Sequence, residues 1–127
     1  MPGNPSADDT DFGARIKRIY EPRTPDDGVR ILVDRLWPRG ISKARAGLDL
    51  WLKDVAPSAA LREWFGHRSE RWTEFQRRYR EELLDSTALE QLREIARTQR
   101  VTLLYAARDE EHNEAATLAY FLLHDSA

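Results

Sequence analysis

The sequence predicts a small three-layer α/β domain of Rossmann-like type, in which a parallel or mixed sheet carries helices on both faces. Two apolar runs without polar alternation, ILV (residues 31–33) and VTLLYA (residues 101–106), are typical of strands covered on both sides. Amphipathic stretches with helical spacing occupy much of the chain between these runs. Strands separated by helices need crossover connections, which join parallel strands and are nearly always right-handed.

Strands are predicted in four places. Residues 14–20 form a half-polar strand, and the turn residues EPRTPDDG follow it at 21–28. Residues 30–36 form the second strand and residues 101–106 the last. Residues 48–54 alternate leucine with polar or aromatic side chains, which suits a short strand, with a helical turn as the alternative.

Capping residues and apolar spacing predict four helices. Ser58 caps the first, which ends at Gly66. Residues 69–84 form the second, with Trp72, Phe75, Tyr79 and Leu83 on one apolar stripe.

The last two helices are predicted from their caps. Thr87 begins the third helix, and Glu90, three residues further on, completes a capping box. Asp109 is expected to cap the fourth, which runs through about His124.

The composition describes one globular domain. Of 127 residues, 41% are hydrophobic and 33% are charged, which is enough for a single core. Residues 1–13 show no periodicity and are expected to form a mobile tail, so that residues 14–127 form the domain. No apolar run approaches the ~18 residues of a membrane span, and no signal peptide opens the chain. We therefore expect a cytoplasmic protein without membrane contact.

Several kinds of site are excluded or disfavoured. The 20 basic and 22 acidic residues give a net charge of -2, which argues against a basic surface over the whole protein. The absence of cysteine excludes thiolate nucleophiles and cysteine-ligated metals, and the three histidines are scattered, so no metal site is predicted. Nucleotide fingerprints are absent, no cofactor is predicted, and Ser42 has no recognisable triad partner.

Candidate site residues follow the two buried strands. Ligands bind open α/β sheets beyond the carboxyl ends of the strands. The stretch VDRLWPRGISK (residues 33–43) leaves the second strand, and RDEEHN (residues 108–113) leaves the last. If these strands are neighbours, both stretches face one pocket. The predicted ligand-binding residues are Arg35, Trp37, Arg39, Gly40, Lys43, Arg108, His112 and Asn113.

These residue types suit an anionic ligand. Arg35 or Arg39 offers a planar fork for phosphate or carboxylate, and Gly40 allows the backbone to approach closely. Backbone N–H groups at a helix start near residues 109–113 would add donors, although the acidic side chains there compete with an anion.

Proton transfer and purely structural roles remain open for the same residues. His112, Asp34 and Tyr105 are the candidate acids or bases, so whether a reaction is catalysed is undecided. Asp34 and Arg35 can instead form a structural ion pair. His112 can help to cap the last helix, because its ring is within reach of Asp109.

The tryptophans have two interpretations, base stacking and core burial. Trp64 and Trp72 lie on helical stripes and Trp51 lies beside a strand, which favours the core. Trp37 precedes a proline that forces it to be extended, so it stays open for stacking.

Three functions follow from these observations. The leading hypothesis is a crevice that binds a small anionic ligand, phosphate- or nucleotide-like. The second is a nucleic-acid-associated module, in which Trp37 stacks on bases and basic side chains bind phosphates. Those basic residues are Arg35, Arg39, Lys43 and Arg45. The third is a protein-interaction domain without catalysis, marked by an exposed apolar patch. The oligomeric state is not predicted.

Long stretches of the sequence resemble a bacterial family. They are IKRIYEP (16–22), DGVRILVDRLWPRGISK (27–43), WLKDVAPS (51–58), LREWFGH (61–67), RWTEFQRRYREEL (71–83) and VTLLYAARDEEHNEA (101–115). Together they closely resemble the YeaO-like branch of the family catalogued as domain of unknown function 488. The resemblance implies a compact cytoplasmic α/β protein and supplies no substrate or reaction. Other branches carry Cys-His-Arg after the final strand, where this chain has Glu111-His112-Asn113, so a thiol-dependent role does not transfer.

Overall fold

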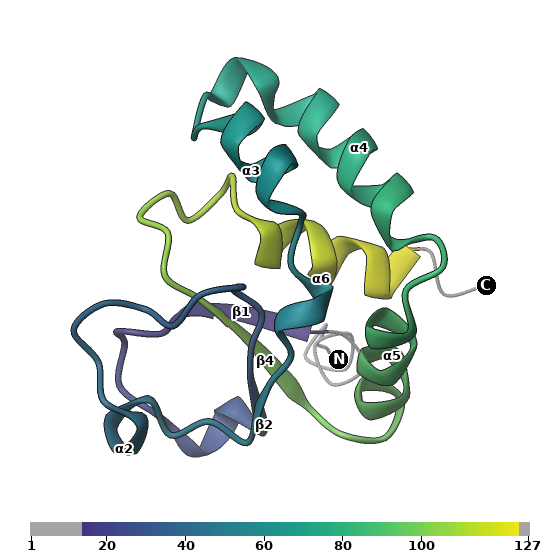
Figure 1. Cartoon of the computed structure of the whole chain (residues 1–127). Coiled ribbons are helices and arrows are strands. Elements are labelled where there is room, and N and C mark those ends of the chain that lie inside the picture. The colour runs from purple at the N-terminus through teal and green to yellow at the C-terminus, as the bar shows by residue number, and fades with distance from the viewer. Residues whose placement is uncertain (1–13, 125–127) are drawn as a thin grey trace, which may run out of the picture.

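A four-stranded parallel sheet forms the centre of the molecule. The computed structural model describes residues 14–124, so the predicted tail at 1–13 lies outside the described residues. The strand order is β1-β4-β2-β3, and the strands are β1 (Ala14–Arg18), β2 (Val29–Leu32), β3 (Leu50–Trp51) and β4 (Val101–Tyr105). β4 lies between β1 and β2, which places the last strand of the chain centrally. The segments that leave these three strands emerge at one end of the sheet (Figure 1).

Helices cover both faces of this sheet, which confirms the predicted α/β class. The α-helices of the described residues are α2 (Lys43–Ala46), α3 (Ala59–Phe65), α4 (Trp72–Leu83), α5 (Thr87–Thr98) and α6 (Glu114–His124). Single 3-10 turns are η1 (Pro25–Asp27), η2 (Lys53–Val55) and η3 (Ser69–Arg71). α6 packs along β1 and β4, whereas α3 and α4 pack on each other above it (Figure 1). None of the helices in residues 14–124 has the length and apolar character of a membrane span.

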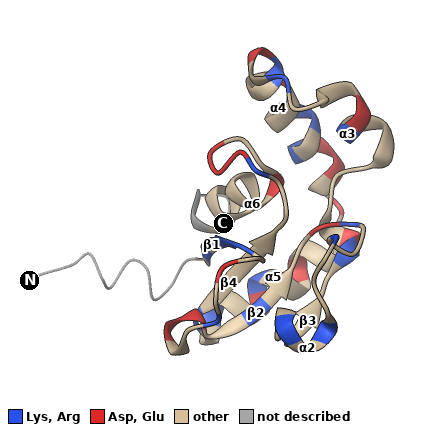
Figure 2. Cartoon of the chain, turned by 90° about the vertical axis from the view of Figure 1, so that its left-hand side faces the viewer, with Lys and Arg blue, Asp and Glu red and all other residues tan. Residues whose placement is uncertain are grey.

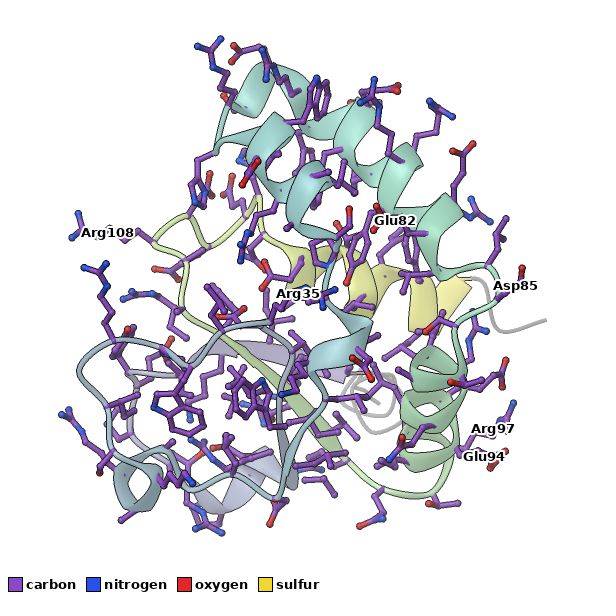
Figure 3. All side chains as sticks on the ribbon, in the orientation of Figure 1. Arg35, Glu82, Asp85, Glu94, Arg97 and Arg108 are labelled. Atoms are coloured by element: carbon purple, nitrogen blue, oxygen red, sulfur yellow. The ribbon has the colours of Figure 1, made fainter. Side chains whose placement is uncertain are left out.

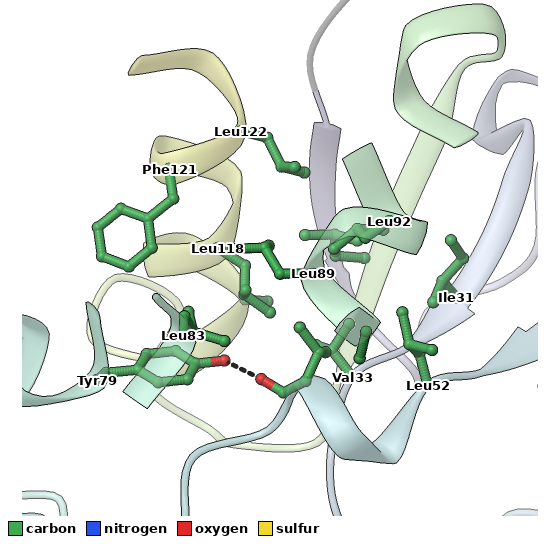
Figure 4. Close-up of a cluster of buried hydrophobic side chains, with 14 of the residues drawn as sticks. Ile31, Val33, Leu52, Tyr79, Leu83, Leu89, Leu92, Leu118, Phe121 and Leu122 are labelled. Carbon is green, nitrogen blue, oxygen red and sulfur yellow. Dashed lines mark hydrogen bonds between the residues drawn. The ribbon is translucent and has the colours of Figure 1, made fainter. Parts of the chain in front are cut away.

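The two faces of the sheet are covered unequally. Ile31 and Val33 belong to a large core shared with residues of α3, α4, α5 and α6 (Figure 4). Leu32 belongs to a smaller core on the other face, to which the segment 37–48, with the single turn of α2, contributes Ile41 and Ala46. Ile31, Leu32 and Val33 each have 0% of their surface exposed. The prediction of a strand covered on both faces is therefore confirmed.

The strands are shorter than the sequence predicts. The second strand ends at Leu32 rather than at residue 36, although the Val33 N–H still donates to the Leu104 carbonyl at 3.1 Å. The third pairs only at Leu50–Trp51 within the predicted 48–54. The prediction continues the second strand to residue 36 because Leu36 is apolar. In the structure Leu36 is 62% exposed and packs in neither core.

The third helix begins at Thr87, as predicted, but its predicted cap is wrong, and the predicted start of the last helix is wrong as well. Ser86 caps α5, because its side chain accepts the backbone N–H of Leu89, so the cap precedes Thr87 by one residue. α6 begins at Glu114 and not after Asp109, because Asn113 caps it by accepting the Ala116 N–H at 2.9 Å.

A buried arginine stands at the start of β2. Arg30 is only 1% exposed. Its guanidinium donates to the carbonyls of Ala46 at 2.7 Å and Gly47 at 3.0 Å, and it forms an ion pair with Asp27. Each nitrogen of the side chain therefore has a protein partner, which is the condition for burying a charge.

Asp27 is the common partner in this region. Its carboxylate also accepts the Lys17 ammonium at 3.0 Å and the Thr24 backbone N–H at 3.1 Å. Burial by itself raises the pKa of Asp27, but the bonds from Thr24, Lys17 and Arg30 outweigh burial and hold that pKa well below its usual range. We refer to Lys17, Asp27 and Arg30 as the buried ion cluster.

Candidate functional site

A cavity of about 500 Å³ lies beyond the carboxyl ends of β1, β2 and β4. Open α/β sheets bind ligands at this end. The loops that follow the three strands, α3 with its flanking residues and the first residue of α6 all contribute to the wall. The polar and charged lining residues are Tyr20, Asp34, Arg35, Arg39, Arg62, His67 and Glu114, and the others are Leu36, Trp37, Pro38, Ala56, Pro57, Ala106 and Ala107.

Two carboxyl groups meet in this cavity. Asp34 follows β2 and Glu114 opens α6, and their side chains are hydrogen-bonded to each other. Burial raises the pKa of the Glu114 carboxyl well above its usual range, and the hydrogen bond to Asp34 and the negative charge of Asp34 raise it further. Asp34 Oδ2 also accepts a hydrogen bond from the Ala106 backbone N–H at 3.0 Å. We call Asp34 and Glu114 the acid pair; burial and the contact with Asp34 both favour the protonated form of Glu114.

The arginines of the cavity differ in how they are held. Arg35 lies in the middle of the molecule (Figure 3), where it donates to the carbonyls of Ala56 at 3.1 Å and Pro57 at 3.3 Å. Arg39 and Arg62 are exposed, and within residues 14–124 their guanidinium groups have no hydrogen bond or ion pair. Two cations therefore border the cavity without an ion-pair partner in the described part of the chain.

The predicted ion pair between Asp34 and Arg35 is wrong. No ion pair joins them in the described part of the chain. Instead, Asp34 bonds to Ala106 and to Glu114, while Arg35 turns to backbone carbonyls. Both residues follow the end of β2, and each finds its partners in other segments of the chain.

The stretch 33–43 contributes only part of its predicted residues to the cavity wall. Trp37 lines it, but the indole N–H donates to the Ile41 carbonyl at 2.8 Å, and the ring packs edge-on against Trp51 at 5.4 Å. Gly40 lies outside the lining; its φ of +74° is left-handed, and an added Cβ would meet nothing within 4 Å. Glycine is thus needed there for the turn. Lys43 opens α2 and is exposed outside the lining.

The stretch 108–113 folds as a tight turn. The Asp109 carboxylate accepts the backbone N–H groups of His112 at 3.0 Å and Glu111 at 2.9 Å, and its second oxygen lies 3.0 Å from Nδ1 of His112. These backbone bonds first, and then the His112 ring, lower the pKa of Asp109 to about 2. Asn113 donates to the Asp109 carbonyl and caps α6. The backbone N–H groups of Glu111 and His112, which lie in the stretch predicted to bind an anion, therefore already donate to Asp109.

The remaining candidates lie apart from the acid pair. Arg108 projects outward (Figure 3) and lines a second hollow with Asp109, which shares His67 and residues 106–107 with the first cavity. The His112 ring stacks edge-on against Trp72 at 5.1 Å and lines neither hollow. Tyr105 lies in the large core, where burial raises its pKa.

The sequence interpretation missed Glu114, Arg62 and His67. Glu114 follows Asn113, a good capping residue, and a helix start placed there would have brought this carboxylate to the strand ends. For Arg62 and His67 the local pattern holds no such signal, because their place in the wall depends on how α3 packs. Within residues 14–124, no group of three or more His, Cys, Asp or Glu side chains has an arrangement suited to a metal ion.

Comparison with known proteins places the chain in a family. A family model described as the inactive DUF488-N3 subclade matches residues 14–127. An uncharacterized protein of Mycobacterium tuberculosis is 50% identical over 108 residues, which cover 85% of this chain and 92% of that protein. The uncharacterized protein YeaO of Escherichia coli K12 is 43% identical over 109 residues, 85% of this chain and 95% of its own length. No solved structure gives a significant match. The chain belongs to the DUF488 family, in its inactive N3 subclade.

Proposed function

We propose that the protein binds a small anionic ligand in the cavity at the carboxyl ends of the strands. The observation that carries the proposal is the composition of the wall, where three guanidinium groups border the cavity and the two carboxyl groups are hydrogen-bonded to each other. The raised pKa of Glu114 favours its neutral form, and in that form it does not repel an anion. A volume of about 500 Å³ suits a small molecule.

Arg39 and Arg62 are the proposed anion ligands. Both border the cavity and lack partners among the described residues, so neither must break an internal bond to bind. Arg35 already donates to two carbonyls through Nε and Nη2, which orients its guanidinium and leaves Nη1 without a hydrogen bond among the described residues. Carboxylate and phosphate oxygens match such planar donors.

Binding without catalysis is the better-supported version of this proposal. The family description names an inactive subclade, and two of the three candidate acids or bases, His112 and Tyr105, do not line the cavity. The proposed location remains the cytoplasm.

A nucleic-acid module has less support. α2 carries exposed Lys43 and Arg45, but basic and acidic residues are interspersed along the rest of the described chain (Figure 2). Trp37, the proposed stacking residue, is held by Ile41 and Trp51. A protein-interaction role would use exposed apolar residues, and the large ones are Leu36, Leu84 and Tyr120, on three separate segments.

Thermal-shift and calorimetric titrations of the full chain test the proposal. The panel contains inorganic phosphate, nucleotides and organic carboxylates. We expect at least one to raise the melting temperature, because a ligand at 100 times its Kd stabilises by about 2.7 kcal/mol. Arg39→Ala should abolish the shift, whereas Lys43→Ala, a cation of the same stretch outside the wall, should keep it.

Two outcomes would overturn the proposal. One is that no member of the panel shifts the melting temperature. The other is that Lys43→Ala and Arg39→Ala weaken binding equally and that binding falls steeply with salt, since this pattern indicates a diffuse phosphate-binding surface.

A further inference from the structure

The cavity contains unpaired charges of both signs. Arg39 and Arg62 have no anionic partner within residues 14–124, and no ion pair satisfies Asp34 there either. The charge of Arg62 acts on Glu114, yet the two side chains form no ion pair. Charged groups that form internal ion pairs would have to break them to bind a ligand. Because these groups form none, both the arginines and the carboxyl groups can bind a charged ligand.

The charges also lie at different depths. Asp34 and Glu114 are partly buried, whereas Arg39 and Arg62 are exposed. Apolar surface lies in the same wall, supplied by Leu36, by the two prolines and by alanines at residues 56, 106 and 107. The wall therefore has an inner acidic part, an outer cationic part and apolar surface beside them.

We infer that the ligand is zwitterionic, an amino-carboxylate with an apolar body, whose ammonium group meets the acid pair and whose carboxylate meets Arg39 and Arg62. The inference rests on the proposed anion site and names the class of ligand for it. A purely anionic ligand would leave the acid pair without a partner, and a purely cationic one would leave the arginines without a partner. A zwitterion satisfies both sets of charges.

Ligand binding then moves one proton. In the free protein the hydrogen bond to Asp34 raises the pKa of Glu114 and so favours a proton on Glu114. When an ammonium group arrives, Glu114 releases this proton to solvent, and two carboxylates accept hydrogen bonds from the cation. The other titratable groups that act on Glu114 are Arg62 from α3 and Tyr79 from α4. Arg62 favours proton release from Glu114, because a nearby positive charge stabilises the carboxylate.

Matched ligand pairs test the inference by isothermal titration of the full chain at neutral pH. Phenylalanine is compared with 3-phenylpropionate and with 2-phenylethylamine, and 6-aminohexanoate is compared with hexanoate. We expect an amino acid to bind about tenfold or more tightly than its desamino analogue, since hydrogen bonds to charged groups are worth roughly 1.5–3 kcal/mol. Titration in two buffers of different ionisation enthalpy should show proton release.

Glu114→Gln supplies the matched variant, because the amide keeps the shape of the side chain but cannot ionise. It should weaken the amino acid about tenfold or more and leave the desamino acid unchanged. Proton release should disappear in this variant. Circular dichroism and the melting temperature show whether it has folded.

The outcomes separate this inference from the proposed function. If desamino acids bind as tightly as amino acids, and Arg39→Ala weakens both, the zwitterion is excluded while the anion site stands. If 2-phenylethylamine binds most tightly and Arg39→Ala changes nothing, both ideas fail. If none of these compounds and no member of the anion panel binds, both fail as well.

Discussion

Two groups of charged side chains, one near the amino end and one beyond the carboxyl end of β2, use the same residue types in opposite ways. In the buried ion cluster, Arg30 and Lys17 close on Asp27, and carbonyls take the remaining donors. In the cavity, Asp34 is hydrogen-bonded to Glu114, and Arg39 and Arg62 have no ion-pair partner within residues 14–124. A cluster with all its partners stabilises the fold, while one with unmatched charges is suited to a ligand. The difference lies in whether the surrounding backbone supplies the missing partners.

The largest expected effect comes from opening the buried ion cluster. Asp27→Asn removes the charge that neutralises Arg30, which is 1% exposed. Breaking a buried pair on one side costs about 3–5 kcal/mol, so the free energy of unfolding should fall by that amount in urea denaturation. A loss below about 1 kcal/mol would contradict this view of the cluster.

The two groups should respond to pH in opposite directions. The pKa of Asp27 is lowered in the folded state, so its stabilisation is present above the unfolded pKa, about 4, and is lost as pH falls from there toward the folded pKa. The pKa of Glu114 is raised, so its contribution is present below about 4 and is lost as pH rises through the folded pKa.

Urea titrations from acid to alkaline pH check both signs. The difference between the wild type and Asp27→Asn should shrink in acid. Glu114→Gln should gain stability relative to the wild type as pH rises, because the amide carries no charge to desolvate. Parallel pH profiles for all three proteins would show that neither carboxyl is perturbed.

A smaller effect is expected where α6 begins, since this start places Glu114 in the cavity. Asn113→Ala removes the cap of a buried helix start and should cost about 1–2 kcal/mol in urea denaturation. Asp109→Ala is the matched control, and it should cost less because its carboxylate holds only an exposed turn. If Asp109→Ala cost more than Asn113→Ala, the helix would instead start near Asp109.

The smallest effect on stability is expected at the open arginines. Arg39→Ala and Arg62→Ala remove exposed side chains whose guanidinium groups have no hydrogen bond or ion pair among the described residues, so each should change the free energy of unfolding by no more than about 0.5 kcal/mol. Denaturation curves that overlay the wild type, together with lost ligand binding, would mark these residues as binding groups. A loss above about 1 kcal/mol would show that they hold the fold instead.

Local patterns predicted most of the fold. The runs at 31–33 and 101–105 are buried throughout, as expected of central strands in a parallel sheet. Strand ends were predicted less well, because hydrophobicity alone does not report where a ladder of hydrogen bonds stops. Arg30 was not expected to be buried, since a charge is normally taken out of water only with partners, and its carbonyl partners lie at residues 46–47.

The sequence by itself determined the α/β class, the family and the stretch after β2 as part of the cavity wall. Apolar periodicity, cap residues and long motifs are local patterns, so they can be recognised along the chain. Only the tertiary structure decided which charges meet. Asp34 and Glu114 are 80 positions apart, and they touch because β4 lies beside β2 and α6 leaves from its end. Charge pairing depends on distances in space. Arg35 shows this most clearly, because it forms no ion pair with its sequence neighbour Asp34 and donates instead to the carbonyls of Ala56 and Pro57.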